Sequence, residues 1–259
     1  MEIFILLIIL FAGIIAGIFT GFSGGSATNI FIPMLVLLAG YSPYMAVGVA
    51  LTVDVFSCII AFSVYNRKIK IKFKPFIPLL ISSLIGVFMG SYYSVQVPSN
   101  LLEILIGVTI CFIGFKFITK KKSSSSNTHK KVNKIFKKYK MVISVLFGLI
   151  IGMVCGFFGG GGGLLLLGVL ILILNYETHE AIGLSVLIML FLALFGGAIH
   201  YFYMPFPLIP ALIGCIGGVI GAMYSSVLAN KISEDKLNII VGIFLLIMGG
   251  SLLVSGALL

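Results

Sequence analysis

The chain has 259 residues and a net charge of +10, yet 60% of its residues are hydrophobic and only 9% are charged. A soluble domain carries about 25% charged residues, because its surface must face water. The composition therefore excludes a water-soluble globular protein and favours an integral membrane protein.

The positive charge is concentrated in two segments that lie between apolar stretches. Of the 17 lysines and arginines, five lie in residues 67–74 and ten in residues 116–140. Basic segments between membrane spans are typical of cytoplasmic loops, and they attract the anionic head groups of lipids. No nucleic-acid-binding motif accompanies the charge, so we expect membrane lipids rather than nucleic acid as its partners.

In the first half of the chain, five apolar segments are predicted to be helices: residues 3–22, 27–40, 44–65, 75–94 and 101–118. A helical span of the bilayer core requires about 20 residues, and the second segment is too short for one. We therefore expect the first two segments to form a helical hairpin that is broken by glycines. The first segment has no basic residues before it and further spans follow, so it is not predicted to be a cleavable signal peptide.

A polar linker, residues 119–140, is predicted to separate two membrane-embedded repeats, residues 1–118 and 141–259. The linker contains four consecutive serines and many lysines, a composition typical of a solvated segment. The second repeat has its own five apolar segments, and their ranges are 141–158, 162–174, 181–201, 207–229 and 237–257. The predicted fold class is all-α, a polytopic membrane protein with roughly 8 to 10 membrane segments.

A shift of 135 positions places the first half of the chain on the second. The matched pairs are Gly13 and Gly148, Gly17 and Gly152, Gly21 and Gly156, Phe22 and Phe157, Gly24 and Gly159, Gly25 and Gly160, Tyr41 and Tyr176, Ala46 and Ala181, Gly48 and Gly183, Gly107 and Gly242, and Gly114 and Gly249. One offset that holds along the whole chain favours a duplicated unit over coincidence.

The charge pattern predicts that the two repeats cross the membrane in opposite directions. The loop at residues 67–74 is basic, whereas the corresponding loop at 201–207 carries no charge and the next loop, at 230–236, holds two lysines. Because basic loops stay in the cytoplasm, the linker is predicted to be cytoplasmic and both termini external, in the cell membrane. Inverted repeats are common in secondary transporters, whose substrate lies near the membrane midplane.

Each repeat carries a glycine-rich break after its first apolar segment, at residues 21–29 and 156–163. Non-helical backbone at membrane depth is tolerated only where protein or a water-filled cavity covers it. The helix that follows begins with free N–H groups and a positive dipole end, which bind anions. The alternative is that the glycines only allow close packing of helices. The residues predicted to bind a small anion are Ser23, Gly24, Gly25, Ser26, Thr28, Asn29, Gly159, Gly160, Gly161, Gly162 and Gly163.

The break, the short apolar segment, the Ala-Val-Gly at 46–48 and a basic loop, repeated around a basic linker, resemble the sulfite exporter TauE/SafE family of membrane proteins. The resemblance covers the chain outside the linker and implies transport of small sulfur-containing anions such as sulfite, thiosulfate or sulfonates like sulfoacetate. The family's break often reads Gly-x-Gly-Gly-Gly, which residues 159–163 match and residues 23–26 match loosely. The family also places a hydroxyl pair after the first glycine of the third segment. Ser185 is the nearest match here, and the resemblance adds it to the anion site.

Asp54 lies in the middle of the third apolar segment, and a carboxylate inside a membrane is costly and usually functional. At helical spacing it shares a face with Ala50, Ser57 and Ala61, so this face points to protein or to a cavity rather than to lipid. The second half has Met189 at the corresponding position. Asp54 is therefore predicted to carry a coupling proton. Coordination of a cation and a purely structural role are the alternatives.

No catalytic, metal-binding or nucleotide-binding pattern occurs in the sequence, so we predict neither an enzyme nor a cofactor. The four cysteines stand singly in apolar segments, which argues against a disulfide framework or a zinc site; they are Cys58, Cys111, Cys155 and Cys215. The predicted function is secondary transport or export of small anions across the cytoplasmic membrane, and the resemblance favours sulfur-containing anions. A cation or metal exporter that uses Asp54 is one alternative, and a structural protein of membrane assembly is another.

Three minor expectations concern packing and the membrane interface. Glu103 is expected to reach the outer interface by snorkelling, and His200 is expected to be an interface residue near the outer face. Two stripes of small residues are predicted to be helix-packing seams. The first stripe is Ser82, Gly86, Gly90 and Ser94, and the second is Gly217, Gly221 and Ser225.

Overall fold

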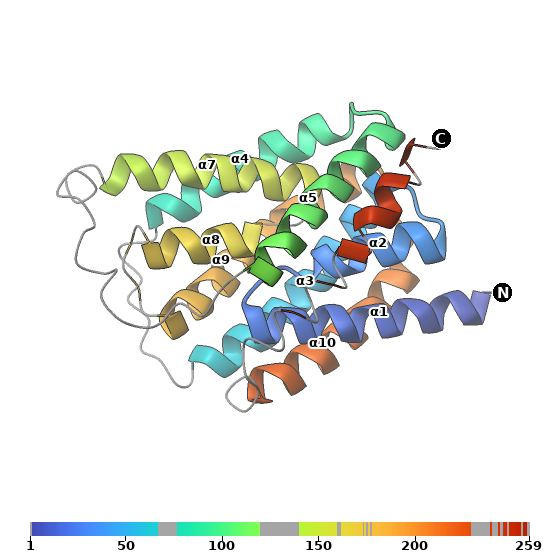
Figure 1. The fold of residues 1–259 in the computed structure, drawn as a ribbon, viewed down its shortest axis with the longest axis horizontal. Helices are drawn as coiled ribbons and strands as arrows, with labels where there is room; N and C mark the ends of the chain where they lie inside the picture. Colours follow the sequence, from blue (N-terminus) through green and yellow to red (C-terminus); the bar gives the residue numbers. More distant parts are fainter. Residues whose placement is uncertain are drawn as a thin grey trace.

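The computed structural model describes residues 2–66, 77–119, 140–159, 162–172, 174, 176 and 178–228, together with scattered residues between 239 and 257. Every regular element in this part of the chain is an α-helix (Figure 1), so the predicted all-α fold is confirmed. The basic loop at 67–74, most of the linker and the loop at 230–236 lie outside the described residues, as do Gly160 and Gly161.

The second helix of each half is short, and the other helices are long. Six of them are long and apolar enough to cross a bilayer, namely α1, α3, α4, α7, α9 and α10. By contrast, α2 has 12 residues and α8 has 11, too few for a span at 1.5 Å per residue, as predicted. The bounds are α1 (Glu2–Ser23), α2 (Thr28–Ala39), α3 (Pro43–Asn66), α4 (Ile77–Ser94), α5 (Ser99–Thr119), α7 (Lys140–Phe158), α8 (Gly162–Leu172), α9 (Thr178–Tyr203) and α10 (Leu208–Leu228).

Large apolar side chains cover the outward faces of the bundle. On α4, Ile81, Ile85 and Phe88 are each more than half exposed, and so are Leu212 and Ile216 on α10. These residues recur every three or four positions, so they form one continuous stripe on each helix. A stripe of this kind suits the hydrocarbon tails of lipids and would cause aggregation in water.

Two pairs of neighbouring helices each combine one helix from the first half of the chain with one from the second half. Helix α1 lies beside α10 and runs parallel to it, while α4 lies beside α7 in the same way, at opposite edges of the bundle (Figure 1). Helices α3 and α9 lie between these pairs and run antiparallel to each other. The offset of 135 relates α1 to α7 and α4 to α10. The pair of α1 with α10 therefore corresponds to the pair of α7 with α4, as is expected of two equivalent halves. The inverted repeat itself stays a prediction.

Glycines form the contact between the paired helices. A Cβ at Gly86 or Gly90 would overlap the backbone of α7, and a Cβ at Gly217 or Gly221 would overlap the backbone of α1. Both predicted packing seams are therefore confirmed. Small residues allow backbones to approach closely, and this close approach takes the place of the hydrophobic effect inside a membrane.

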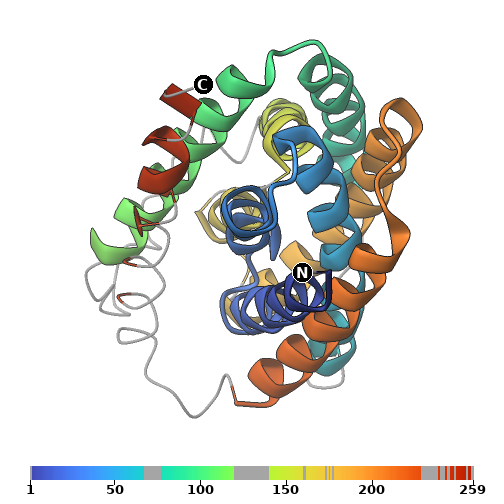
Figure 2. The ribbon, with the colours of Figure 1, turned by 90° about the vertical axis from the view of Figure 1, so that its right-hand side faces the viewer.

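Helix α5 and the described residues of the C-terminal segment lie side by side, apart from the centre of the bundle (Figure 2). A Cβ at Gly249 would meet the Sγ atom of Cys111 at 2.7 Å, and a Cβ at Gly256 would meet Ile104. The end of the first half thus packs against the end of the second, which leaves the four paired helices and α2, α3, α8 and α9 to enclose the centre.

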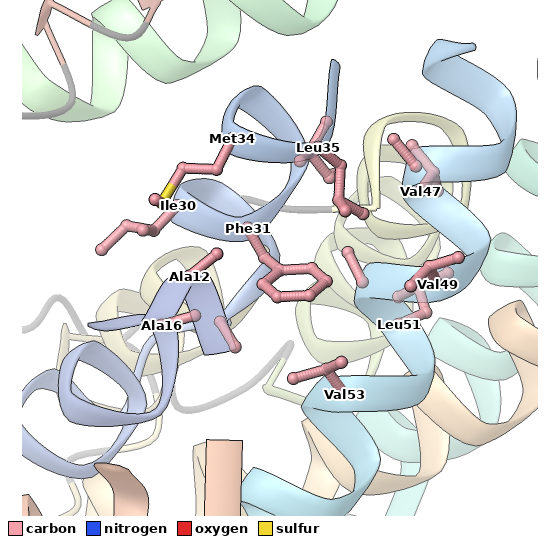
Figure 3. Close-up of a cluster of buried hydrophobic side chains, with 14 of the residues drawn as sticks. Ala12, Ala16, Ile30, Phe31, Met34, Leu35, Val47, Val49, Leu51 and Val53 are labelled. Atoms are coloured by element: carbon pink, nitrogen blue, oxygen red, sulfur yellow. The ribbon is translucent and has the colours of Figure 1, made fainter. Parts of the chain in front are cut away.

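The short helix α2 is held by an apolar cluster that it forms with α1 and α3. The ring of Phe31 lies between Ala12 and Ala16 of α1 and Val53 of α3 (Figure 3), and it is fully buried. A Cβ at Gly214 of α10 would come within 2.7 Å of this ring. The ring makes van der Waals contacts with α1, α3 and α10, so Phe31 anchors α2, which is too short to span the bilayer.

Candidate functional site

The first break begins where α1 ends at Ser23. The N–H of Gly24 still donates to the carbonyl of Thr20 at 3.0 Å, but Gly24 then adopts φ = 63° and turns the chain out of the helix. Positive φ is cheap only for glycine. A Cβ at this position would also lie 2.9 Å from Cγ2 of Ile182, on α9. Both the turn and the contact with the other half therefore require glycine.

The second break repeats this geometry in the other half. Helix α7 ends at Phe158, and Gly159 follows with φ = 69°. A Cβ at Gly159 would lie 2.7 Å from Cγ1 of Val47, on α3. Gly159 and Val47 stand at the positions that the offset of 135 relates to Gly24 and Ile182. Each break is thus packed against the third helix of the opposite half.

The two breaks meet near the middle of the bundle. A Cβ at Gly163, in the first turn of α8, would lie 3.0 Å from Cα of Gly25 and 3.0 Å from the backbone nitrogen of Ser26. The hydroxyl of Ser185 donates to the carbonyl of Gly24 at 3.2 Å. The starts of α2 and α8 therefore face one another, and both carry the partial positive charge of a helix N-terminus.

Most of the predicted site residues lie together in the structure, and the others are outside the described residues. Ser26, Thr28, Asn29 and Ser185 are buried with the described glycines of the breaks. The side chain of Ser23 is outside the described residues, like the whole of Gly160 and Gly161. The proximity of the two breaks follows from the geometry, whereas binding of an anion by them stays a prediction.

Asp54, on α3, forms hydrogen bonds with the first break. Its Oδ1 accepts the backbone N–H of Ala27 at 2.9 Å, and its Oδ2 accepts the hydroxyl of Ser26 at 2.6 Å. Ala27 is the residue at the N-cap position of α2, where backbone N–H groups lack helical partners. The carboxylate is fully buried. In its ionised form it is an anion that the protein itself supplies to the start of α2.

A chain of hydroxyl groups extends from Asp54 into the break. The hydroxyls of Ser26 and Thr28 lie 2.5 Å apart, and the backbone N–H of Thr28 also donates to the oxygen of Ser26 at 3.3 Å. When Asp54 is ionised, Ser26 donates to it and Thr28 donates to Ser26. When Asp54 is protonated, it can donate to Ser26, and Ser26 can then donate to Thr28. The same atoms accommodate both charge states without moving.

The second break has no acidic counterpart on α9. The position that corresponds to Asp54 is Met189, and a Cβ at Gly162 would lie 3.3 Å from its Sδ atom. The same added Cβ at Gly162 would lie 3.1 Å from the Cβ atom of Cys155. The start of α8 is thus covered by soft, neutral side chains, and the two breaks differ in charge.

Two buried cysteines were missed as members of this site. Cys58 lies one turn after Asp54, and its Sγ–H donates weakly to Oδ1 at 3.7 Å. Cys155 stands at the end of α7 and is also fully buried. The spacing of four residues between Asp54 and Cys58 was a usable signal, because it places both on one helix face. Among the described residues, no group of three His, Cys, Asp or Glu side chains could hold a metal ion.

Two expectations about the membrane interface are wrong. His200 is fully buried, and its Nε2 lies 3.1 Å from the carbonyl oxygen of Gly156, just before the second break. Glu103 is only 3% exposed, so protein covers it instead of leaving it free to snorkel to the interface. Both side chains are long enough to turn inward, and a sequence cannot show which neighbour receives them.

A family profile and three related proteins match this chain over nearly its whole length. The profile of the sulfite exporter TauE/SafE family matches residues 9–252. A probable membrane transporter protein of Bacillus subtilis strain 168, YunE, is 23% identical, and the alignment covers 98% of each chain. Probable membrane transporter proteins of two strains of Xylella fastidiosa, Temecula1 and 9a5c, are each 25% identical over 93% of this chain and 92% of their own. No solved structure matches the chain.

Proposed function

The chain belongs to the sulfite exporter TauE/SafE family, a family of membrane transporters, and from this premise we propose that it carries small sulfur-containing oxyanions across the cell membrane. The substrate binds where the two breaks meet. One observation carries the proposal, namely the contact of Gly163 with Gly25 and Ser26, because it brings the starts of α2 and α8 to one place.

Two facing helix starts suit a small oxyanion. Their backbone N–H groups are donors, and the helix dipoles add positive potential. Serine and threonine hydroxyls add donors from the first break only. Such a site needs no arginine or lysine, and none lies among the described residues of the two breaks. In a low dielectric, neutral donors bind an anion strongly, because they do not reorganise as water does.

Asp54 makes binding of an anion dependent on protons. An ionised carboxylate at the start of α2 occupies the donors that a substrate would use, and it repels a second anion. Protonation removes the charge and turns the hydroxyl of Ser26 towards Thr28. A substrate anion and a proton therefore enter the site together, as in a symporter. Uptake against a negative interior needs such a proton, whereas export of each negative charge gains about 2.3 kcal/mol per 100 mV without one.

The cation exporter and the membrane-assembly protein are less well supported. Both oxygens of Asp54 face donors, the N–H of Ala27 and the hydroxyl of Ser26, whereas a bound cation would require acceptor atoms around it. An assembly protein would use its glycines for packing alone. The glycines of α4 and α10 do so, but Gly163 faces the break of the other half instead of a helix backbone.

Ligand-dependent thermal stability of the purified protein tests the proposal. Sulfite, thiosulfate and sulfoacetate should each be compared with chloride and with Zn²⁺ or Co²⁺ salts at equal ionic strength. A specific ligand at 100 times its Kd raises the stability by about 2.7 kcal/mol. Stabilisation by a sulfur oxyanion supports the proposal, and stabilisation by the metal salts alone contradicts it.

Gly163→Ala provides the matched site variant, because its Cβ would fill the space between the breaks. Gly250→Ala is the control, since no described residue lies within 4 Å of a Cβ at Gly250. The site variant should lose stabilisation by the oxyanion, while the control keeps it. Equal behaviour of the two variants would move the binding site away from the breaks.

A further inference from the structure

The last turn of α1 is tied to the end of α3. The hydroxyl of Tyr65 donates to the carbonyl of Gly21 at 2.8 Å. Gly21 is two residues from the end of α1, so its carbonyl is one of the last four, which have no partner inside the helix. Tyr65 is 7% exposed and stands one residue before the end of α3. This bond fixes the first break against its own half.

The last turn of α7 is tied to the end of α9 in the same manner. Nε2 of His200 lies 3.1 Å from the carbonyl oxygen of Gly156, and since a carbonyl can only accept, Nε2 carries the proton. The hydroxyl of Ser91 donates to the same oxygen at 3.2 Å. Removal of the imidazole would therefore leave this carbonyl with a donor.

The two contacts are related by the offset of 135 positions. The shift carries Gly21 onto Gly156 and Tyr65 onto His200. It also carries Tyr44 onto His179, so the first half has tyrosine at both positions and the second half has histidine at both. The ring of Tyr44 stacks on His200, with 4.2 Å between the ring centroids and 30° between the planes. The side chain of His179 lies outside the described residues.

The two contacts lie at opposite ends of the bundle, with Asp54 between them. Tyr44 and Tyr65 stand near the start and the end of α3, and Asp54 stands halfway along the same helix. Because α3 and α9 are antiparallel, His200 lies at the Tyr44 end. On each side of Asp54, one hydrogen bond thus ties the helix end that precedes a break to α3 or α9.

On the basis of the proposed transport function, we propose that Tyr65 and His200 are the latches of two gates. Tyr65 holds the first break closed at one end of the bundle, and His200 holds the second break closed at the other end. The structure has both latches engaged and the centre sealed, because Asp54, Cys58 and Cys155 have no exposed surface. Release of one latch opens the central site to one side of the membrane only, as alternating access requires.

A simpler role for both side chains is to cap a helix end. A cap contributes to stability, and its loss loosens the protein without regard to side. Loss of a latch, by contrast, exposes the centre from one side of the membrane only. The side from which the centre becomes accessible therefore separates the two roles, and a measurement of stability alone does not.

The buried thiols of Cys58 and Cys155 report this accessibility. In a Cys111→Ser, Cys215→Ser background, right-side-out and inside-out vesicles are treated with a membrane-impermeant maleimide. The variants are Tyr65→Phe, which removes one hydroxyl, and His200→Phe, which removes both ring nitrogens. His200→Tyr is the matched control, because it places at position 200 the hydroxyl that position 65 already uses.

We expect each phenylalanine variant to raise thiol labelling several-fold from one side only, and the two variants to act on opposite sides. His200→Tyr should label as slowly as the background. Labelling that is unchanged, or raised equally from both sides, would overturn the proposal. If His200→Phe is not recovered folded, one-sided labelling of Tyr65→Phe supports the proposal and any other pattern overturns it. No substrate is used, so the outcome is independent of the proposal that the cargo is a sulfur oxyanion.

Discussion

Asp54 of α3 accepts a hydrogen bond from the backbone N–H of Ala27, with 2.9 Å between Oδ1 and the nitrogen, so a carboxylate of one helix occupies the start of another. The position related to Asp54 by the offset is Met189, which is neutral. Under the proposed function, a substrate anion competes with the ionised form of Asp54 at the start of α2 and with no corresponding charge at the start of α8.

Replacement of Asp54 by asparagine should remove the pH dependence of transport. If substrate binds only when Asp54 is protonated, transport by the parent protein is fast at low pH and falls as pH rises, because the neutral form is depleted. Asparagine is neutral at every pH, so Asp54→Asn should transport at a rate that pH does not change. Counterflow of labelled substrate in vesicles with equal pH on both sides measures this rate.

Ser57→Ala is the control for this variant, since Ser57 is buried on the same helix and its hydroxyl donates only to the carbonyl of Val53, at 3.0 Å. Its pH profile should match that of the parent protein. An Asp54→Asn variant that folds and keeps the parent profile would assign Asp54 a structural role.

Ser26 and Asp54 should be energetically coupled. Ser26→Ala removes the hydroxyl that donates to Oδ2 at 2.6 Å and leaves that oxygen buried without this donor, which costs about 1–3 kcal/mol. In an Asp54→Asn background the same change should cost less, because no charge is left unsatisfied. The difference is expected to be about 0.5–3 kcal/mol, the range for contacting residues. Unfolding in detergent of the four proteins of the cycle gives this value, and additive effects would separate the two residues.

Much of the fold could be predicted because membranes make composition and length informative. The spans follow from hydropathy, and the short α2 and α8 follow from the length that a bilayer demands. The breaks at Gly24 and Gly159 could be located because positive φ favours glycine. The seams of α4 and α10 could be located because small residues recurred every four positions.

The partners of individual side chains could not be predicted. Tyr65 and His200 each bind a carbonyl 44 residues earlier in the chain, and this distance is set by how α3 and α9 fold back on the breaks. Cys155 reaches the centre because α7 ends there, and apolar surroundings in sequence gave no hint of it. The side-chain direction of a buried polar group depends on tertiary packing, which local patterns do not contain.

Alanine at the packing glycines should destabilise the protein without a specific loss of substrate. A Cβ at Gly90 would overlap the carbonyl of Met153 on α7, and a Cβ at Gly221 would overlap the carbonyl of Ile14 on α1. Because the obstacle is backbone, the helices must separate, and overpacking of this kind costs about 1–3 kcal/mol. Thermal unfolding should show a lower Tm for Gly90→Ala and Gly221→Ala, while Gly250→Ala keeps the parent value.

The ratio of two effects separates packing from binding. Gly90→Ala should lower the Tm in the absence of ligand and keep the increase that ligand gives, whereas Gly163→Ala should lose that increase more than it loses the initial Tm. Glycine variants that all lose both quantities in the same proportion would make the breaks another packing feature.

The inverted topology predicts the side of each loop. Tyr44 stacks on His200, so the start of α3 and the end of α9 lie at one end of the bundle, the end that also holds the first residues of α1 (Figure 1). The basic loop at 67–74 follows the far end of α3, and the linker follows α5. Positive charge keeps such loops in the cytoplasm. Reporter fusions after Lys70 and Ser124 should therefore read cytoplasmic, and fusions after Met204 and Leu259 should read external.

Pairs of fusions serve as controls for one another, because Lys70 and Ser124 share a predicted side and so do Met204 and Leu259. The two loops at 67–74 and 201–207 correspond under the offset of 135, but one is basic and the other carries no charge. If the halves are inverted, corresponding loops must lie on opposite sides of the membrane. A cytoplasmic signal at Met204 together with a cytoplasmic signal at Lys70 would place them on the same side, and the two halves would then be parallel repeats, in which α2 and α8 could not start from opposite directions at one central site.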